Sequence, residues 1–125
     1  MFKLYTVPGT CALASHIALE EAGAPYSVEV LSFKNNQQSS ADYLKINPMG
    51  KVPALQDGDA TLAEAAAICA YVAERYPDAK LAPPVGDPDR AKYLYWLFFG
   101  PSCIEPAIVQ LATKIEMNPV AAGWG

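Results

Sequence analysis

The first part of the chain changes from a strand pattern to a helical pattern and back. Residues 2–6 predict a short strand, because their apolar side chains alternate onto one face. After a Pro8-Gly9 turn, an apolar-rich run to about Ala22 predicts a helix, which Thr10 or the preceding glycine can cap. Residues 26–31 alternate again and predict a second strand. A strand–helix–strand unit makes the two strands parallel.

The next part of the chain is polar and then strand-like. Residues 32–41 predict a loop, and residues 42–46 predict a short helix. Proline cannot donate to a sheet, so Pro53 is either the first residue of a strand or part of a cis bond in a tight bend. Asp57-Gly58-Asp59 indicates a hairpin, followed by a brief strand at residues 60–62.

A strongly apolar helix is predicted after the hairpin. Residues 61–64, Thr-Leu-Ala-Glu, fit the capping-box pattern, which opens a helix from about Ala63 to Tyr76 that Pro77 ends. The interior of this helix, residues 65–72, is apolar on nearly all sides. We therefore expect the helix to be buried.

A linker precedes the last helix. Residues 77–88 are rich in Pro, Asp, Gly and Ala, and residues 87–89, Asp-Pro-Asp, combine a capping acid, a proline at the first helical position and a second acid. The helix is predicted to extend to about Glu116, with kinks at Pro101 and Pro106.

Along this last helix, apolar residues recur at alternating steps of three and four. Such a stripe requires another helix against it. Residues 117–125 are too short and too rich in helix breakers to supply one. Either the partner is another subunit, or the chain is the front part of a longer protein. The stripe consists of Leu94, Leu97, Pro101, Ile104, Ile108, Leu111 and Ile115.

Composition and charge narrow the functional classes. The net charge is −4 without a basic run, which argues against nucleic acid as a partner. No apolar segment approaches the length of a membrane span, and residues 1–25 do not fit a secretory signal. The three cysteines, Cys11, Cys69 and Cys103, are odd in number and lack a Cys-x-x-Cys pair, which argues against a disulfide framework and a structural zinc site. We therefore expect a cytoplasmic protein without a metal.

Cys11 is the main candidate for chemistry. It falls on the first turn of the first predicted helix, where unpaired N–H groups and the helix dipole favour an anion. Helix starts are among the settings that lower the pKa of a thiol, so a reactive thiolate is reasonable here. The alternative is that Cys11 packs as a small buried apolar residue.

The order of the predicted elements, together with three motifs, resembles the glutathione transferase superfamily. The motifs are Asn-Pro-Met-Gly-Lys-Val-Pro at residues 47–53, Glu-Ala-Ala-Ala-Ile-Cys-Ala-Tyr at residues 64–71, and Pro-Gly-Thr-Cys-Ala-Leu at residues 8–13. The last is similar to bacterial beta-type members, which carry a cysteine at this place. The resemblance covers essentially the whole chain.

The resemblance implies the fold and its division into domains. An α/β thioredoxin-like domain, built as a βαβ unit followed by a β-hairpin and a helix, is expected over residues 1–77. A linker is expected over residues 78–88. Residues 89–125 then form the first long helix of an all-α domain and are expected to be only the beginning of that domain.

The resemblance also assigns a glutathione site. It implies that Pro53 is cis and that the backbone of Val52 pairs with the cysteinyl part of glutathione. Glu64 and the backbone N–H of Ala65 hold the γ-glutamyl end. A helix start with spare N–H donors is physically suited to a carboxylate, and Glu64 is suited to an ammonium group. The other interpretation of Glu64 is the acid of the capping box.

The remaining assignments concern the glycyl carboxylate and the sulfur. Lys34 and Lys51 are candidates to pair with the glycyl carboxylate. Thr10 and Cys11 are expected to face the glutathione sulfur. Tyr5 is a further candidate for an activating hydroxyl, because other classes of the family use a tyrosine near this point; its alternative is core packing.

Three residues depart from the family pattern or stand outside it. Ala65 lies where many members have a serine that helps to hold the glutathione carboxylate, so only its backbone N–H remains. Glu105 lies where beta-type members often have a histidine that reaches toward the sulfur. His16, the only histidine, is expected to be structural or solvent-facing.

The sequence thus predicts a glutathione transferase that uses glutathione as co-substrate and acts as a homodimer on a small electrophile or a disulfide. Thiol exchange through a mixed disulfide at Cys11 is one form of this activity. The alternative is a non-catalytic binding or assembly module that keeps the fold of the family. Cys69 and Cys103 are expected to be inert, and the aromatic residues at 93–99 are expected to pack between helices.

Overall fold

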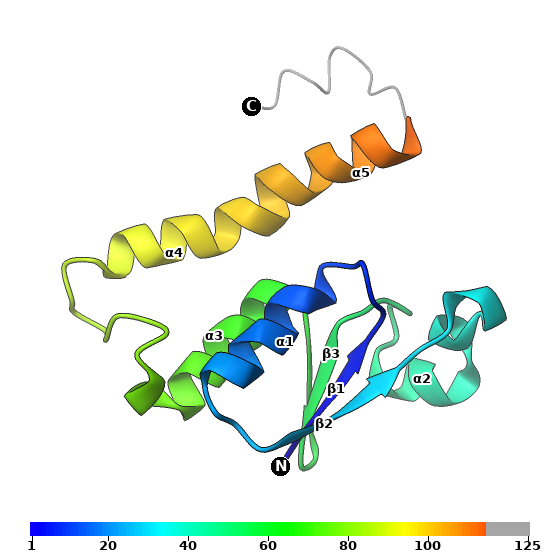
Figure 1. Ribbon diagram of the computed structural model, residues 1–125, viewed down its shortest axis with the longest axis horizontal. Helices are drawn as coiled ribbons and strands as arrows, with labels where there is room; N and C mark the ends of the chain where they lie inside the picture. The colour runs from blue at the N-terminus through cyan, green and yellow to red at the C-terminus, as the bar shows by residue number, and fades with distance from the viewer. Residues whose placement is uncertain (115–125) are drawn as a thin grey trace.

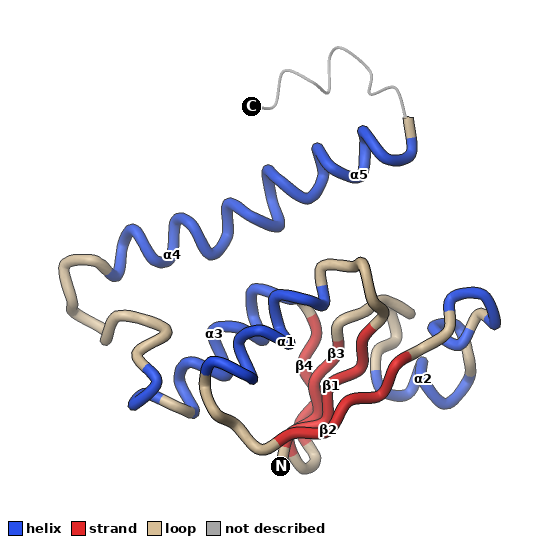
Figure 2. Tube along the Cα trace, viewed as in Figure 1, coloured by secondary structure: helices blue, strands red, loops and turns tan. Residues whose placement is uncertain are grey.

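The computed structural model describes residues 1–114, which begin with a four-stranded sheet in the order β2-β1-β3-β4 (Figures 1 and 2). β1 pairs in parallel with β2 and antiparallel with β3, which in turn pairs antiparallel with β4. The predicted strands and their directions are confirmed. Their bounds are Phe2–Thr6 for β1, Tyr26–Val30 for β2, Ala54–Asp57 for β3 and Ala60–Ala63 for β4.

Helices cover both faces of this sheet. α1 and α3 lie side by side on one face, and α2 lies on the other (Figure 1). Two short 3-10 turns, Phe33–Asn35 and Gln37–Ser39, form much of the predicted loop before α2. This βαβ unit, followed by a hairpin and a helix, is the predicted thioredoxin-like arrangement. The helices extend over Ala12–Glu21 for α1, Ala41–Ile46 for α2 and Ala65–Arg75 for α3.

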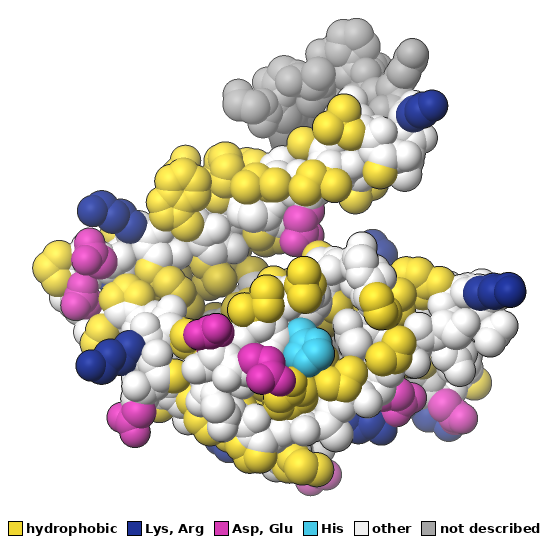
Figure 3. Space-filling view, viewed as in Figure 1, with side chains coloured by type: hydrophobic (Ala, Val, Ile, Leu, Met, Phe, Trp, Pro, Cys, Tyr) yellow, Lys and Arg dark blue, Asp and Glu magenta, His cyan; other side chains and the backbone are white. Residues whose placement is uncertain are grey.

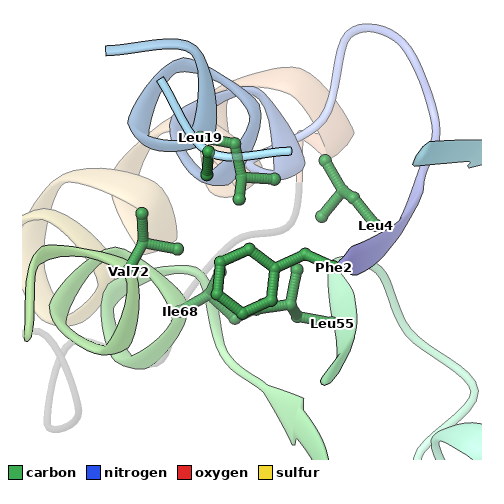
Figure 4. Close-up of a cluster of buried hydrophobic side chains, with 7 residues drawn as sticks. Phe2, Leu4, Leu19, Leu55, Ile68 and Val72 are labelled. Carbon is green, nitrogen blue, oxygen red and sulfur yellow. The ribbon is translucent and has the colours of Figure 1, made fainter. Parts of the chain in front are cut away.

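The main hydrophobic core lies between the sheet and the pair α1 and α3. Figure 4 shows that side chains from β1, β3 and both helices converge there. Burial of several large apolar side chains is the main favourable term that fixes these helices on the sheet. A second, smaller cluster on the opposite face joins Tyr5 to Tyr43 of α2. The labelled residues of the main core are Phe2, Leu4, Leu19, Leu55, Ile68 and Val72.

The prediction of a capping box before α3 is wrong. Thr61 lies inside β4, where it pairs with Gln56 of β3. Glu64 is the N-cap residue, but its side chain makes no capping hydrogen bond. The helix is also less buried than expected, since only Ala65, Ile68, Val72 and Ala73 are fully covered. Sheet pairing holds Thr61 away from the helix start, so the local sequence pattern does not decide the cap.

The last helices form one long rod after the segment that was predicted as a linker. This segment contains a single 3-10 turn, Pro77–Ala79, and the rod consists of α4 (Arg90–Phe99), a π-helical turn η4 (Gly100–Ile104) and α5 (Glu105–Thr113). The predicted cap at Asp87 is not the N-cap of α4, which is Asp89 and has no side-chain cap. The Asp87 carboxylate accepts from the N–H of Asp89 at 2.8 Å in the turn before the helix.

Pro101 changes the helix type rather than bending the rod. The chain passes from α4 to α5 through η4 without a sharp kink (Figure 1). A π-helical turn accommodates one extra residue, and such turns occur often at functional sites. The predicted end of the helix at Glu116 lies outside the described residues.

One part of the apolar stripe of the rod packs against the α/β unit, and another part is exposed. Leu97 lines a small cavity against α1 and α3, whereas Leu94, Ile104, Ile108 and Leu111 are exposed. Figure 3 shows apolar side chains along the rod and on the facing surface of the α/β unit. The last stripe residue, Ile115, lies outside the described residues.

Candidate functional site

A cavity of about 270 Å³ brings together parts of the chain that are far apart in sequence. Cys11 comes from the start of α1, and the loop 47–53 comes from the approach to β3. The start of α3 contributes Glu64 and Ala65, and the rod contributes Pro101 and Glu105. Two helix starts, a backbone loop and the π-helical turn therefore share one cavity.

Cys11 is exposed and precedes the first residue of α1. Its own backbone is already helical, with φ of −60° and ψ of −13°. The Sγ–H group donates to the carbonyl oxygen of Val52 at 3.7 Å. A thiol is a weak donor, so this contact orients the sulfur without fixing it firmly.

The electrostatic surroundings of Cys11 oppose a thiolate. Partial burial raises the pKa of the thiol above its ordinary value, and the carboxylates of Glu105 and Glu64 raise it further. A backbone N–H lowers the pKa but does not outweigh these effects. The sequence-based expectation that the helix start lowers this pKa is therefore wrong, because partial burial of the thiol, and after it two acids from distant parts of the chain, raise the pKa.

Thr10 holds the turn before α1. Its hydroxyl donates to the carbonyl of Val7 at 2.7 Å and accepts from the N–H of Ala12 at 3.3 Å. The Thr10 carbonyl accepts from the N–H of Leu13 at 3.2 Å. Thr10 thus holds the turn one residue before the N-cap residue Cys11, whose own side chain makes no capping hydrogen bond. The Thr10 side chain uses its only hydroxyl proton within this turn.

The loop 47–53 is held by polar groups that the sequence analysis did not single out. The Lys51 carbonyl accepts from Tyr43 Oη at 2.6 Å and from Asn47 Nδ2 at 2.8 Å. Asn47 Oδ1 also accepts from the N–H of Met49 at 3.1 Å. Asn47 is buried, and in the sequence it stands out only as the first residue of the motif at residues 47–53.

The same loop presents Val52 and Pro53 to the cavity. The Val52–Pro53 peptide bond is cis, which confirms the geometry implied by the family resemblance. Gly50 has a φ of 62°, and a Cβ atom there would lie 3.0 Å from the Gln38 carbonyl oxygen. Only glycine fits this close approach without displacing one of the two backbones.

The start of α3 is open toward the cavity. Glu64 has a φ of 72° and a ψ of 119°, which is rare for a residue with a side chain. Its carboxylate does not cap the helix, and its carbonyl accepts from the N–H of Ile68 at 2.9 Å. The N–H groups of the first helical turn, including that of Ala65, therefore have no side-chain cap.

Glu105 enters the cavity from the rod. It is the first residue of α5, and its N–H donates to the carbonyl of Gly100 across the π-helical turn. Pro101 and Glu105 are four residues apart and line the cavity together. Among residues 1–114, no lysine, arginine or histidine forms an ion pair with Glu105.

Three predicted site residues, Tyr5, Lys34 and Thr10, do not line this cavity. Tyr5 is buried, and its hydroxyl donates to Gln56 Oε1 at 2.6 Å, which supports the core-packing alternative. Lys34 lies in the turn Phe33–Asn35 and does not line the Cys11 cavity. Lys51 lines both this cavity and a neighbouring one of about 320 Å³, to which Thr10 also contributes.

Other candidates lie outside the site. His16 Nε2 lies 2.8 Å from the Tyr26 hydroxyl, in agreement with a structural role. The residues described contain no cluster of His, Cys, Asp and Glu that could hold a metal ion. Within residues 1–114, none of the helices combines the length and apolar character needed to cross a bilayer.

The comparisons with known proteins point to one family. A family model described as the N-terminal domain of glutathione S-transferase matches residues 1–74. Glutathione S-transferase GstA of Escherichia coli O157:H7 is 43% identical over 97 residues, covering 76% of this chain and 48% of that protein. The chain thus spans about half the length of the curated relatives it matches.

Two solved structures extend the likeness to the fold. A glutathione transferase homologue from Sulfitobacter with bound glutathione is 35% identical, with a TM-score of 0.82 over 96% of this chain and 59% of that one. A sphingomonad glutathione S-transferase complexed with glutathione is 41% identical, with a TM-score of 0.78 over 87% of this chain and 55% of that one.

Proposed function

The chain belongs to the glutathione transferase family, and we propose that it binds glutathione in the Cys11 cavity. There it activates the glutathione thiol for attack on a small electrophile or for thiol–disulfide exchange. The observation that carries this proposal is the open start of α3 beside Cys11. An uncapped helix start favours a carboxylate, and the unusual backbone of Glu64 is typical of residues held for function.

The γ-glutamyl end of glutathione carries one carboxylate and one ammonium group, and the site offers a partner for each. The Ala65 N–H lies at the positive end of α3 and suits the carboxylate. The Glu64 carboxylate lines the same cavity and suits the ammonium group. The lack of a hydroxyl at Ala65 leaves the carboxylate with a backbone donor only.

The middle and the glycyl end are assigned to the neighbouring loop. The Val52 backbone pairs with the cysteinyl part of glutathione, next to the cis bond at Pro53. Lys51 pairs with the glycyl carboxylate, supported by its place between the two neighbouring cavities. Lys34 remains a second candidate for that carboxylate, from the turn that Phe33 begins.

Cys11 is the group that we assign to the glutathione sulfur. At neutral pH its raised pKa keeps it as a neutral S–H, which can turn from the Val52 carbonyl to donate to a bound thiolate. The glutathione thiol loses its proton to solvent and attacks the electrophile, while the donor stabilises the developing anion. Thr10 is the weaker candidate, because its hydroxyl proton is bound to the Val7 carbonyl.

A second candidate function is a non-catalytic module that binds glutathione or assembles with other chains. It is favoured by the raised pKa of Cys11, which disfavours an attacking thiolate at this residue. The missing hydroxyl at Ala65 also favours weak binding. Glutathione binding without turnover of any electrophile by the full protein would identify this alternative.

The wider properties of the protein are also proposals. We assign residues 1–77 to the thioredoxin-like domain, 78–88 to the linker and 89–125 to the helical domain, in accord with the family match to residues 1–74. A bacterial beta-like type is supported by the similarity to a bacterial relative. The free thiols of all three cysteines support a cytoplasmic location, and the exposed apolar face of α4 and α5 supports a homodimer.

Isothermal titration calorimetry with glutathione, under reducing conditions, tests the proposed site. We expect Glu64→Gln to weaken binding about tenfold or more, because a hydrogen bond to a charged group is worth about 1.5 to 3 kcal/mol. Cys11→Ala should change the proton release, measured in buffers of different ionisation enthalpy.

Glu74→Gln is the matched control, because Glu74 is exposed near the other end of α3. It should bind glutathione like the unmodified chain. The proposal fails if the unmodified protein does not bind millimolar glutathione, or if Glu64→Gln binds as tightly as Glu74→Gln.

A further inference from the structure

The π-helical turn η4 gives the Cys11 cavity a second acid. The turn carries the chain from Gly100 to Glu105, so that the side chains of Pro101 and Glu105 both line the cavity. The extra residue of a π-helical turn changes which side chains of α5 face the α/β unit. The position of Glu105 is therefore a consequence of how the rod is built.

The charges of this cavity do not balance. Among its described lining residues, the ionisable side chains are Cys11, Lys51, Glu64 and Glu105. Lys51 is exposed and forms no ion pair with either acid in residues 1–114. In the proposed complex, Glu64 is neutralised by the glutathione ammonium and Lys51 by a glutathione carboxylate. Glu105 is then the remaining carboxylate without a partner.

We propose that Glu105 selects a positively charged second substrate, such as a cationic electrophile or an amine-bearing disulfide. This inference rests on the proposed function, because the second substrate is the molecule that reacts with glutathione in the same cavity. A cation beside Glu105 gains Coulomb energy and removes the repulsion that this carboxylate exerts on a neighbouring thiolate. An anionic substrate is repelled both by the Glu105 carboxylate and by the thiolate that attacks it.

Glu105 and Cys11 line the same cavity, so the charge of the Glu105 carboxylate acts on the Cys11 thiol. After partial burial, the Glu105 carboxylate is the next largest cause of the raised pKa of the Cys11 thiol. Glu64 acts in the same direction from the start of α3. The charge that repels a thiolate at Cys11 is therefore also available to attract a cation.

A pair of thiol reagents with opposite charges tests this selection without an enzyme assay. The trimethylammonium-ethyl and sulfonato-ethyl methanethiosulfonates differ mainly in charge. With either reagent, the Cys11 thiolate attacks the reagent sulfur, a new disulfide forms and methanesulfinate leaves. Peptide mass spectrometry reads the label at Cys11 separately from that at Cys69 and Cys103.

We expect the unmodified chain to react faster with the cationic reagent, and Glu105→Gln to reduce the cationic-to-anionic rate ratio about five- to tenfold. The exposed control variant Glu74→Gln should keep the original ratio. In the unmodified chain, raising the ionic strength from about 0.01 to 1 M should also collapse the ratio, because salt screens exposed charges.

The inference is overturned if Glu105→Gln keeps the original ratio, or if the ratio of the unmodified chain does not respond to salt. The salt titration serves as the test if the variant does not fold. Calorimetry on the same preparations separates this inference from the proposed function. Glutathione binding without charge selection overturns the role of Glu105, whereas charge selection without glutathione binding overturns the glutathione site and leaves the preference for cations established.

Discussion

The two helices whose first turns meet at the cavity, α1 and α3, begin in opposite ways. At α1, Thr10 supplies a side-chain acceptor to the N–H of Ala12 and a carbonyl to that of Leu13. At α3, the N-cap residue Glu64 supplies no side-chain cap, and the first N–H groups stay open. The positive end of a helix is available to a ligand only where the chain has not already used it.

The difference explains why Cys11 and Ala65 have unlike chemistry despite similar positions. Cys11 sits at a start whose first N–H groups are bonded within the turn. Partial burial, and after it the carboxylates of Glu105 and Glu64, raise the pKa of its thiol and favour the protonated form. Ala65 sits at a start that is unsatisfied, and its apolar side chain leaves the backbone N–H as the only donor at that residue. The anion-binding capacity of the site therefore lies mainly with α3.

The largest expected effect comes from removing the packing that holds α3 on the sheet. Ile68 is fully buried one turn after Glu64, and its N–H donates to the Glu64 carbonyl. Ile68→Ala should lower the free energy of unfolding by about 2 to 5 kcal/mol, measured by urea denaturation. The smaller change Ile68→Val should cost about 0.5 to 1.5 kcal/mol. Equal stability of the two variants would mean that α3 is not held by this side chain.

The next effect sharpens the contrast at the open helix start. Ala65→Ser adds a hydroxyl beside the uncapped N–H groups, and glutathione affinity should rise about tenfold, from one added hydrogen bond to a charged group. Calorimetry measures the change. Ala66→Ser is the control, because Ala66 does not line the cavity. An unchanged affinity of Ala65→Ser would contradict the placement of a glutathione carboxylate at this helix start.

A smaller effect is expected at the satisfied helix start. Thr10→Val removes the hydroxyl that bonds to Val7 and Ala12, and the free energy of unfolding should fall by about 1 kcal/mol. Thr10→Ser keeps the hydroxyl and should retain most of the stability. Urea denaturation of both variants measures their free energies of unfolding. A Thr10→Val protein as stable as the original would show that this hydroxyl is not important for α1.

The smallest effect concerns the pH dependence of Cys11. The thiolate is the reactive form, so a raised pKa reduces its fraction at neutral pH and slows alkylation. The rate of Cys11 alkylation by iodoacetamide should therefore rise with pH along a curve displaced to higher pH than that of a cysteine in a short peptide. Glu105→Gln should move the curve back toward lower pH. A curve at lower pH than that of the peptide would instead support the expectation that the helix start lowers the pKa of this thiol.

Much of the fold could be predicted because its signals are local. The alternation at residues 26–31, the Asp57-Gly58-Asp59 turn and the Asp-Pro-Asp turn before α4 each depend on neighbouring residues only. The capping box failed for the opposite reason. Thr61 and Glu64 have the spacing of a cap, but pairing with Gln56 in another strand keeps Thr61 in the sheet.

The candidate site could be predicted only in part. The predicted start of the first helix marked Cys11, and the family resemblance marked Val52 and Glu64 as two further parts of the site. The anchors of the loop, Tyr43 and Asn47, carry no signal of their own, because their common acceptor is a backbone carbonyl. Tyr5 was a candidate for an activating hydroxyl because of its position along β1, but its hydroxyl donates a hydrogen bond to Gln56.

The sequence by itself determined the order of the elements, the parallel pair of strands and the identity of the residues that offer chemistry, because periodicity and turn residues act over short distances. The tertiary structure alone decided the charge around Cys11. Glu64 and Glu105 reach it from the ends of two other segments, and one of them depends on a π-helical turn. Electrostatic energy depends on distance in space, so the direction of a pKa shift cannot be predicted from any one stretch of sequence.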